Sequence, residues 1–331
     1  MADVYAGRRV LITGGLGFIG STLAIALVER GAEVTLVDAM LPAYGAQLFN
    51  IEPIRNRVRI NFSDLRDATG LRHVVRDQQT IFNLAGQSSH LRSMNDPVTD
   101  LAINCQSQIS LLTCCREVSP AATLVLASTR QVYGRPQRLP VDETHPTVPV
   151  DINGIHKLAA ESYYRLHSQL YGMRAVILRL TNTYGPRMDL RNVDKGFVGI
   201  FLQRALAGKM LAVFGTGEQR RDFNHVDDVV EALLRIGTCE AALGEVFNLG
   251  HPRPRSLAEF VRLLQRITDC RYELVPFPKD QLAIDIGDYW GNYDKLRSLT
   301  GWEPRIDLEE GLEATVAFAR QHADKCLPVS G

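Results

Sequence analysis

Short apolar runs rich in β-branched residues alternate with longer segments of helical periodicity along residues 1–180. Apolar positions that recur every three or four residues indicate helices, and short apolar runs indicate strands. Most of the runs are apolar throughout, which is typical of strands that helices cover on both faces. The alternation predicts an α/β fold with a doubly wound parallel sheet, with strands at 10–13, 34–38, 58–62, 81–85, 124–128 and 175–180.

The rhythm loosens after Gly185-Pro186. Start and turn signals there predict a helix over 197–207, a tight turn over 215–217, a helix with Asp227 as N-cap, a capping box at Ser256 and Glu259, and a last helix begun by Asp307 with Glu310. These shorter elements predict a smaller C-terminal lobe. We expect a sheet domain of 1–180, rejoined by 223–250, and a lobe made of 181–222 and 251–331. The cleft between them is where α/β folds usually hold ligands.

A glycine-rich loop follows the first expected strand and opens a helix. It reads Thr-Gly-Gly-Leu-Gly-Phe-Ile-Gly over 13–20, and its glycines let the backbone approach a pyrophosphate at the helix N-terminus. The second strand ends in Asp38, 18 residues after Gly20 (38 − 20), where a carboxylate bonds ribose hydroxyls. Asp38 would repel a 2′-phosphate, and the two residues after it supply no cation. The pattern predicts a Rossmann-type NAD site that includes Gly14, Gly17, Phe18, Ile19, Gly20 and Asp38.

Composition narrows the class of protein. The 37 basic and 37 acidic residues cancel, so no global field attracts nucleic acid or an anionic membrane. The six cysteines show neither CxxC pairs nor the density of a disulfide scaffold, which favours a reducing compartment and argues against a metal site. The N-terminus offers no signal peptide, and no run of about 18 apolar residues follows. We therefore expect a cytoplasmic protein.

Further motifs occur in order behind the glycine loop: Ser-Asp-Leu at 63–65, Asn-Leu-Ala-Gly-Gln at 83–87, Ser-Thr-Arg-Gln-Val-Tyr-Gly at 128–134, Thr-Asn-Thr-Tyr-Gly-Pro-Arg at 181–187, Arg-Asp-Phe-Asn-His-Val-Asp-Asp at 221–228 and Leu-Thr-Gly-Trp-Glu-Pro at 299–304. Over nearly its whole length the chain resembles the extended short-chain dehydrogenase/reductase family, in particular its nucleotide-sugar epimerases and dehydratases. The resemblance implies that a sugar carbinol is oxidised by hydride transfer to tightly held NAD. The hydride then returns to the other face, or the ketone is used.

The resemblance also implies roles for single residues. Asp64 and Leu65 would meet the adenine, Leu84, Ala85 and Gln87 the dinucleotide, and Lys157 the nicotinamide ribose. Thr129 matches the family's active-site serine or threonine, which bonds the reacting sugar oxygen. Substrate contacts are implied for Ser88, Ser89, Asn182, Arg187 and Arg221, the last three at the nucleotide diphosphate of the sugar substrate. A homodimer formed by the helices near 97–115 and 154–170 is implied as well.

One departure concerns the general base. The family has a tyrosine four residues before the lysine, and this chain has Asn153 there. The spacing keeps positions 153 and 157 on one helical face, so the alignment is hard to shift. A carboxamide cannot accept a proton near neutral pH. His156 is the nearest titratable residue and has a suitable intrinsic pKa, but histidines on helices are more often surface or packing residues.

Two further departures affect the substrate. Family dehydratases carry an Asp-Glu pair after the active-site threonine, whereas this chain has Arg130 and Gln131, which disfavours ordinary dehydratase chemistry. Arg130 either contacts an anionic group such as a uronate carboxylate or forms a structural salt bridge. Where the family often has Arg-x-Gly-Asp, residues 285–288 read Asp-Ile-Gly-Asp, so Arg221, Arg253 or Arg255 would have to hold the diphosphate.

The leading hypothesis is an NAD-dependent nucleotide-sugar epimerase that acts at C4, with an atypical or relocated base. A second hypothesis is a dehydratase, decarboxylase or oxidoreductase that shares the 4-keto intermediate. A third is a catalytically quiet protein that binds NAD or a nucleotide sugar and has lost its base.

Overall fold

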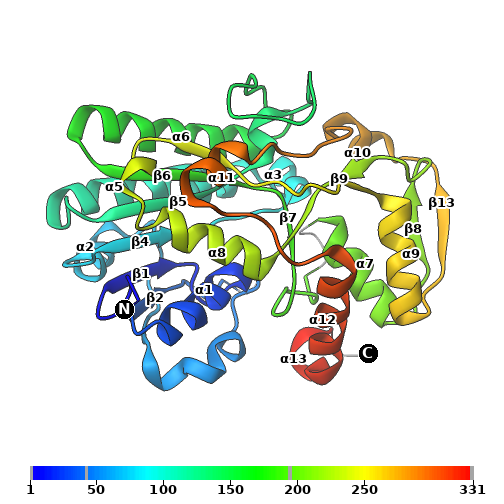
Figure 1. Ribbon diagram of the computed structural model, residues 1–331, viewed down its shortest axis with the longest axis horizontal. Coiled ribbons are helices and arrows are strands. Elements are labelled where there is room, and N and C mark those ends of the chain that lie inside the picture. The colour runs from blue at the N-terminus through cyan, green and yellow to red at the C-terminus, as the bar shows by residue number, and fades with distance from the viewer. Residues whose placement is uncertain (1–2, 42–43, 193–195, 329–331) are drawn as a thin grey trace.

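Seven parallel strands form the central sheet of the computed structural model, which describes residues 3–41, 44–192 and 196–328 (Figure 1). The strand order is β11-β6-β5-β4-β1-β2-β3. The strands are β1 Arg9–Thr13, β2 Glu33–Val37, β3 Arg59–Asn61, β4 Thr80–Asn83, β5 Thr123–Thr129, β6 Arg174–Leu180 and β11 Val246–Asn248. The predicted doubly wound parallel sheet is confirmed.

Both faces of this sheet are buried under helices, as its apolar strands require. The helices are α1 Phe18–Glu29 and α8 Val226–Ile236 on one face, and α2 Ala68–Val75, α5 Ser107–Val118 and α6 Ile152–Tyr171 on the other (Figure 1). Successive strand residues point to opposite faces. Val10 and Ile12 of β1 accordingly pack in the cluster that contains α1 and α8, while Leu11 packs with α2, α5 and α6.

The strand order reverses beside β1, which pairs with β2 on one side and with β4 on the other. In sheets of this kind, ligands bind outside the carboxyl ends of the strands at such a reversal. Short helices connect the elements around this point: η2 Leu48–Arg57, α3 His90–Asn95, α4 Pro97–Leu101, the π-helical η3 Ala102–Gln106, η4 Arg130–Tyr133, and, further away, η5 Glu240–Ala242 and α11 Asp294–Thr300. These connections carry much of the site described below.

A separate apolar core holds the smaller lobe together. It contains Tyr184, Phe201, Phe223 and Phe260, with the Phe223 and Phe260 rings stacked at 5.1 Å between centroids. The elements of the lobe are β7 Asn182–Tyr184, α7 Phe197–Leu206, β8 Leu211–Phe214, β9 Arg220–Arg221, β10 Phe223–His225, β12 Arg255–Ser256, α9 Leu257–Thr268, β13 Tyr272–Val275, α10 Lys279–Ile284, α12 Leu308–Gln321 and α13 Ala323–Cys326.

Local signals predicted most of these elements. All six predicted strands form, α7 lies within one residue of its predicted range, and the capping box at Ser256 is present. The predicted N-cap Asp227 is wrong: β10 runs directly into α8, so His225 occupies that position and accepts from the Asp227 N–H. Asp307 caps α12, but α13 follows it. Within the described ranges, no helix is both long and apolar enough to span a bilayer.

Candidate active site

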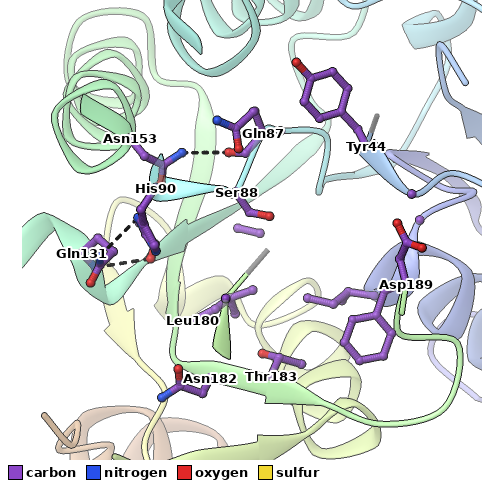
Figure 2. A pocket seen from close by; sticks show the side chains of 18 of the residues that line it. Tyr44, Gln87, Ser88, His90, Gln131, Asn153, Leu180, Asn182, Thr183 and Asp189 are labelled. Atoms are coloured by element: carbon purple, nitrogen blue, oxygen red, sulfur yellow. Dashed lines mark hydrogen bonds between the residues drawn. The ribbon is translucent and has the colours of Figure 1, made fainter. Parts of the chain in front are cut away.

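A cavity of about 720 Å³ lies between the carboxyl edge of the central sheet and the smaller lobe. Its lining runs from the glycine loop past the ends of β2, β4 and β5 and the start of α6 to α7 and β8. Figure 2 shows its middle, where Gln87 and Asn153 lie across from Asn182 and Thr183. The residues predicted at NAD all line it: Gly14, Gly17, Phe18, Ile19, Gly20, Asp38, Asp64, Leu65, Leu84, Ala85, Gln87 and Lys157.

The glycine loop packs so tightly that side chains would not fit. Gly14 has a φ of +68°, and a Cβ built there would lie 2.9 Å from backbone atoms of Leu84 and Ala85. A Cβ at Gly20 would collide with the carbonyl oxygen of Gly14. Gly17 is the N-cap of α1 and provides no side-chain cap, so the first N–H groups of the helix are left for an anion.

Asp38 follows the last residue of β2, and two backbone N–H groups donate to its carboxylate. Its Oδ2 accepts from the Leu16 N–H at 3.1 Å and its Oδ1 from the Met40 N–H at 2.9 Å. Burial raises the pKa of Asp38 above its ordinary value, although these two hydrogen bonds oppose the shift. Each carboxylate oxygen keeps lone pairs for the hydroxyls of a ribose.

Lys157 reaches the middle of the cavity from α6. Its Nζ lies 3.5 Å from the carbonyl oxygen of Ala127. Gly86 leaves room for it, because a Cβ at Gly86 would lie 2.8 Å from that Nζ. Burial lowers the pKa of Lys157 to about 8, an effect that the charges of Asp100 and Glu161 oppose. Near neutral pH the side chain is therefore a poorly solvated cation that a bound ligand would stabilise.

Thr129 and Asn153 lie beside this lysine in the cavity wall. Thr129 ends β5 and caps η4, and its Oγ1 accepts from the Gln131 N–H at 3.3 Å. Asn153 is buried, and its Nδ2 donates to the carbonyl oxygen of Gln87 at 2.8 Å. The structure thus brings together the threonine, the asparagine and the lysine that the sequence places in the active site.

Two arginines, the half-buried Arg130 and the buried Arg221, extend the cavity towards the smaller lobe. Arg130 donates to the neutral amides of Asn182, at 3.1 Å, and Gln131, at 3.4 Å. Burial lowers the pKa of Arg130, but a guanidinium stays charged. Arg221 donates to Asp285 Oδ1 at 3.0 Å, and burial, followed by the charge of Arg130, lowers its pKa to about 10. Two guanidinium groups thus lie in one part of the cavity wall, where they can bind an anionic ligand.

The proposal of His156 as the base is wrong, because its ring is turned away from the cavity. His156 Nδ1 contacts Asp100 Oδ1 at 2.6 Å, and that aspartate is fully buried. Along α6, Asn153 and Lys157 line the cavity and His156 does not; it lies about 60° from position 153 and about 100° from position 157 around the helix axis. Asp100, from α4, holds the His156 ring in the protein interior, outside the cavity lining.

Four other candidates also lie away from the cavity. Arg187 donates to the Asn50 carbonyl oxygen at 3.1 Å and stacks on Phe318, so its predicted place at the diphosphate is wrong. Ser89 is the N-cap of α3 and accepts from the Arg92 N–H, so it serves the helix rather than the substrate. Arg253 and Arg255 form ion pairs with Asp307 and Glu259 outside the lining.

A family model described as the NAD dependent epimerase/dehydratase family matches residues 10–250. The chain belongs to this family. A putative UDP-glucose 4-epimerase of Methanocaldococcus jannaschii is 30% identical over 314 residues, which cover 95% of this chain and 99% of that protein. UDP-glucuronic acid decarboxylase 1 of Xenopus tropicalis is 31% identical, with 96% and 73% covered. The UDP-glucose 4-epimerase of Thermus thermophilus, solved with NAD, has a TM-score of 0.85 and 30% identity, with 95% and 100% covered.

NAD is accordingly the cofactor of this epimerase/dehydratase family member, and the described residues fit it. The glycine cradle admits a pyrophosphate and excludes side chains, and Asp38 lies where a ribose would follow. Asp64 and Leu65 continue the same wall. Arg66 donates two hydrogen bonds from its side chain and one from its backbone N–H to Asp64, and these lower the pKa of that carboxyl.

The sequence patterns do not single out several residues of the wall. Tyr44, His90, Asp189 and Arg204 also line the cavity. His90 is the one histidine among the described lining residues. It follows directly on Ser88 and Ser89, so closeness to predicted substrate residues is the signal that would have found it. Nothing local indicates that it meets Asp151, which lies 61 residues further along the chain (151 − 90).

Proposed function

We propose that this protein is an NAD-dependent nucleotide-sugar epimerase that inverts C4 through a transient 4-keto sugar. The observation that carries the proposal is the single cavity that joins an NAD cradle, Thr129 and Lys157, and the two arginines Arg130 and Arg221. Where a dehydratase would have an acid pair, the cavity has Arg130 and Gln131. Curated relatives that match almost the whole chain include UDP-glucose 4-epimerases.

The side chains divide the work along the cavity. The Thr129 hydroxyl donates to the sugar oxygen that becomes the ketone, and Lys157 binds ribose hydroxyls and keeps positive charge beside the reaction. When bound, NAD supplies the nicotinamide ring that takes up and returns the hydride. Asn153 cannot titrate, so it orients groups near the sugar, and another residue must take the hydroxyl proton.

The smaller lobe holds the nucleotide diphosphate in this account. The guanidinium groups of Arg130 and Arg221 would bind the diphosphate, and Arg130 is oriented by its hydrogen bond to Asn182. Asp285 stands where the family often has arginine and pairs with Arg221. The site therefore carries less net positive charge than an arginine at 285 would provide, and Arg130 makes up part of the difference.

A second candidate is a decarboxylase that uses the same ketone. Arg130 favours it, because its half-buried guanidinium donates to the neutral amides of Gln131 and Asn182 and keeps further N–H groups that would bind a uronate carboxylate. UDP-glucuronic acid decarboxylases are also among the relatives near 30% identity. A catalytically quiet binding protein is the third possibility, and the same experiment separates all three.

The test is a panel of UDP-, dTDP-, GDP- and CDP-sugars, uronates included, incubated with the NAD-loaded protein in deuterated water. An epimerase gives a 4-epimer without deuterium on carbon. Label at C5 would favour a dehydratase, loss of carbon dioxide a decarboxylase, and an unchanged panel a binding protein. Thr129→Val, which keeps the shape of the side chain, is expected to bind the same sugar and convert it poorly.

We further propose a homodimer formed by the helices near 97–115 and 154–170. Large apolar side chains on these helices are exposed in the chain: Val98, Leu101, Ile109, Ile155, Leu166 and Leu170. Ile109→Glu is expected to shift the protein to a monomer in light scattering, while Leu274→Glu, on β13, leaves the dimer intact.

Six free cysteines support a reducing compartment such as the cytoplasm.

A further inference from the structure

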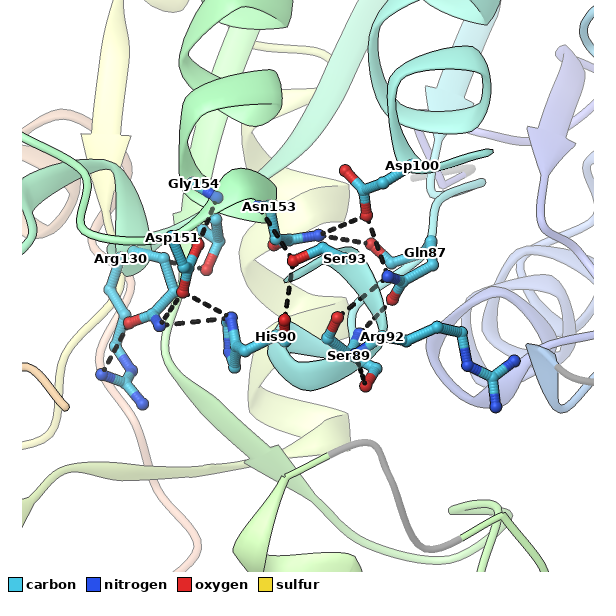
Figure 3. A network of polar contacts seen from close by, with 12 residues as sticks. Gln87, Ser89, His90, Arg92, Ser93, Asp100, Arg130, Asp151, Asn153 and Gly154 are labelled. Carbon is cyan, nitrogen blue, oxygen red and sulfur yellow. Dashed lines mark hydrogen bonds and ion pairs between the residues drawn. The ribbon is translucent and has the colours of Figure 1, made fainter. Parts of the chain in front are cut away.

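We propose that His90, held by Asp151, is the proton acceptor that replaces the missing tyrosine. The inference rests on the proposed function and names a residue of that same site. His90 begins α3, lines the cavity, and leaves 30% of its side chain exposed. Its Nδ1 lies 2.9 Å from Asp151 Oδ2 (Figure 3).

The histidine is fixed beside Asn153 by a short chain of contacts. Ser93 Oγ donates to the His90 carbonyl oxygen at 2.7 Å and accepts from the Asn153 N–H at 3.2 Å. Asp151, two residues before Asn153, caps α6 by accepting from the Gly154 N–H at 2.6 Å. Figure 3 shows the start of α6 and the short helix α3 joined in this way. His90 and Asn153 therefore lie in the same part of the cavity wall.

The contact with Asp151 decides which ring nitrogen carries the proton. Burial alone would raise the pKa of Asp151, but the hydrogen bond and charge of His90 and the Gly154 N–H outweigh it, so the pKa is lowered. An ionised carboxylate only accepts, so Nδ1 of His90 must be the donor. Gln131 Nε2 donates to the same carboxylate oxygen at 3.0 Å, and its 3.3 Å approach to Nδ1 is then a contact between two donors.

This assignment leaves Nε2 with a lone pair. Nε2 forms no hydrogen bond with any other residue that the structure describes. A proton taken up there turns the ring into an imidazolium, which Asp151 stabilises as the carboxylate does in histidine-aspartate pairs of other enzymes. The ring is thus held in one tautomer and one orientation, with a basic nitrogen left for a ligand.

The charged groups around His90 are themselves paired or protonated, so none of those considered below competes with it as the proton acceptor. Asp151 faces the ring from the start of α6, and Arg130 lies near on η4, where it is also attracted to Asp151. From α4, Asp100 is occupied by His156 and Asn153. Arg92, on α3 itself, points away from the pair (Figure 3). Lys157 is mainly protonated near neutral pH and cannot accept a proton in that form.

The step balances with the groups named. His90 Nε2 takes the proton of the C4 hydroxyl, and the C–O bond becomes a carbonyl; bound NAD would supply the acceptor for the C4 hydride. After the ketone presents its other face, the hydride returns to C4 and the imidazolium gives the proton back to oxygen. No other oxidant or acid is needed.

The test compares two histidine variants of the NAD-loaded protein. His90→Gln is expected to lower kcat by about 10²- to 10⁴-fold, the usual contribution of a general base, with NAD content and UDP-glucose binding unchanged. His156→Gln breaks the matching pair with Asp100 outside the cavity and is expected to keep wild-type kcat. Imidazole in the buffer should restore activity to His90→Ala.

A second readout does not depend on turnover. Proton-nitrogen NMR of the histidine rings, assigned with His90→Gln, should show the Nδ1–H tautomer for His90 and a shift of Nε2 when UDP-glucose is added. Wild-type kcat in His90→Gln, an Nε2–H tautomer, or an Nε2 signal that UDP-glucose leaves unmoved would overturn the inference. An unchanged sugar panel with wild-type protein overturns the epimerase instead, and the NMR result then still decides the place of His90.

Discussion

The buried charge of Lys157 is expected to lower the free energy of unfolding of the protein. Burial lowers its pKa to about 8 in the folded protein, against an ordinary value of 10.5. A base whose folded pKa is depressed binds fewer protons folded than unfolded between those values, so its cost is greatest at low pH and is relieved as pH rises through the window. At pH 7 the difference corresponds to about 3 kcal/mol, and at pH 9.5 to about 1 kcal/mol.

Lys157→Met removes the charge and keeps a flexible apolar stem. In urea unfolding of protein freed of NAD, we expect this variant to be more stable than wild type by up to about 3 kcal/mol at pH 7, with the gain shrinking at pH 9.5. Lys209→Met, at an exposed position, should change stability by less than about 0.5 kcal/mol at either pH. A destabilised Lys157→Met, or a gain independent of pH, would refute the reasoning.

Three more outcomes follow from the site. Gly14→Ala should lose bound NAD, which is measured by releasing the nucleotide from purified protein. Gly7→Ala should keep its NAD, because Gly7 has the same φ of +68° but open space around it. Equal NAD contents in the two variants would contradict the role of Gly14 in the NAD site. Asp222 is buried, and burial raises its pKa to about 7. The folded protein therefore loses stability as pH rises from about 4 through 7. Asp222→Asn should raise the free energy of unfolding above that of wild type by up to about 4 kcal/mol at pH 8 and by much less at pH 5. Arg130→Met should weaken nucleotide-sugar binding about tenfold or more in calorimetry with NAD content unchanged; unaltered affinity would remove Arg130 from the substrate site.

The parts of the fold that local physics controls were predictable from the sequence. Apolar runs buried on both faces define the six predicted strands, and the glycine loop with Asp38 defines the cofactor site within a single strand-helix-strand unit. The spacing of Asn153 and Lys157 places both on one face of α6, as the structure has them. Strand β11 escaped prediction because its three residues carry little periodicity and become a strand by pairing with β6.

Long-range partners account for the errors. His156 has the right chemistry and lies near Asn153 in sequence, but Asp100, 56 residues earlier, holds it outside the cavity. Arg187 lies in a motif shared with the family, yet Asn50 and Phe318 fix it elsewhere. His90 is held by Asp151 and, through Ser93, by Asn153, both of them far along the chain. Each of these side chains has a direction that tertiary contacts decide, and the sequence pattern carries no information on those contacts.

The central claim is that the C4 hydride leaves the sugar and returns to it within one turnover. The most direct measurement follows a nucleotide sugar deuterated at C4, chosen from the panel, over many turnovers with the NAD-loaded protein in ordinary water. The account predicts that deuterium remains at C4 in both epimers. Loss of the label to solvent or its appearance at another carbon, in a sample that converts the sugar, would contradict it.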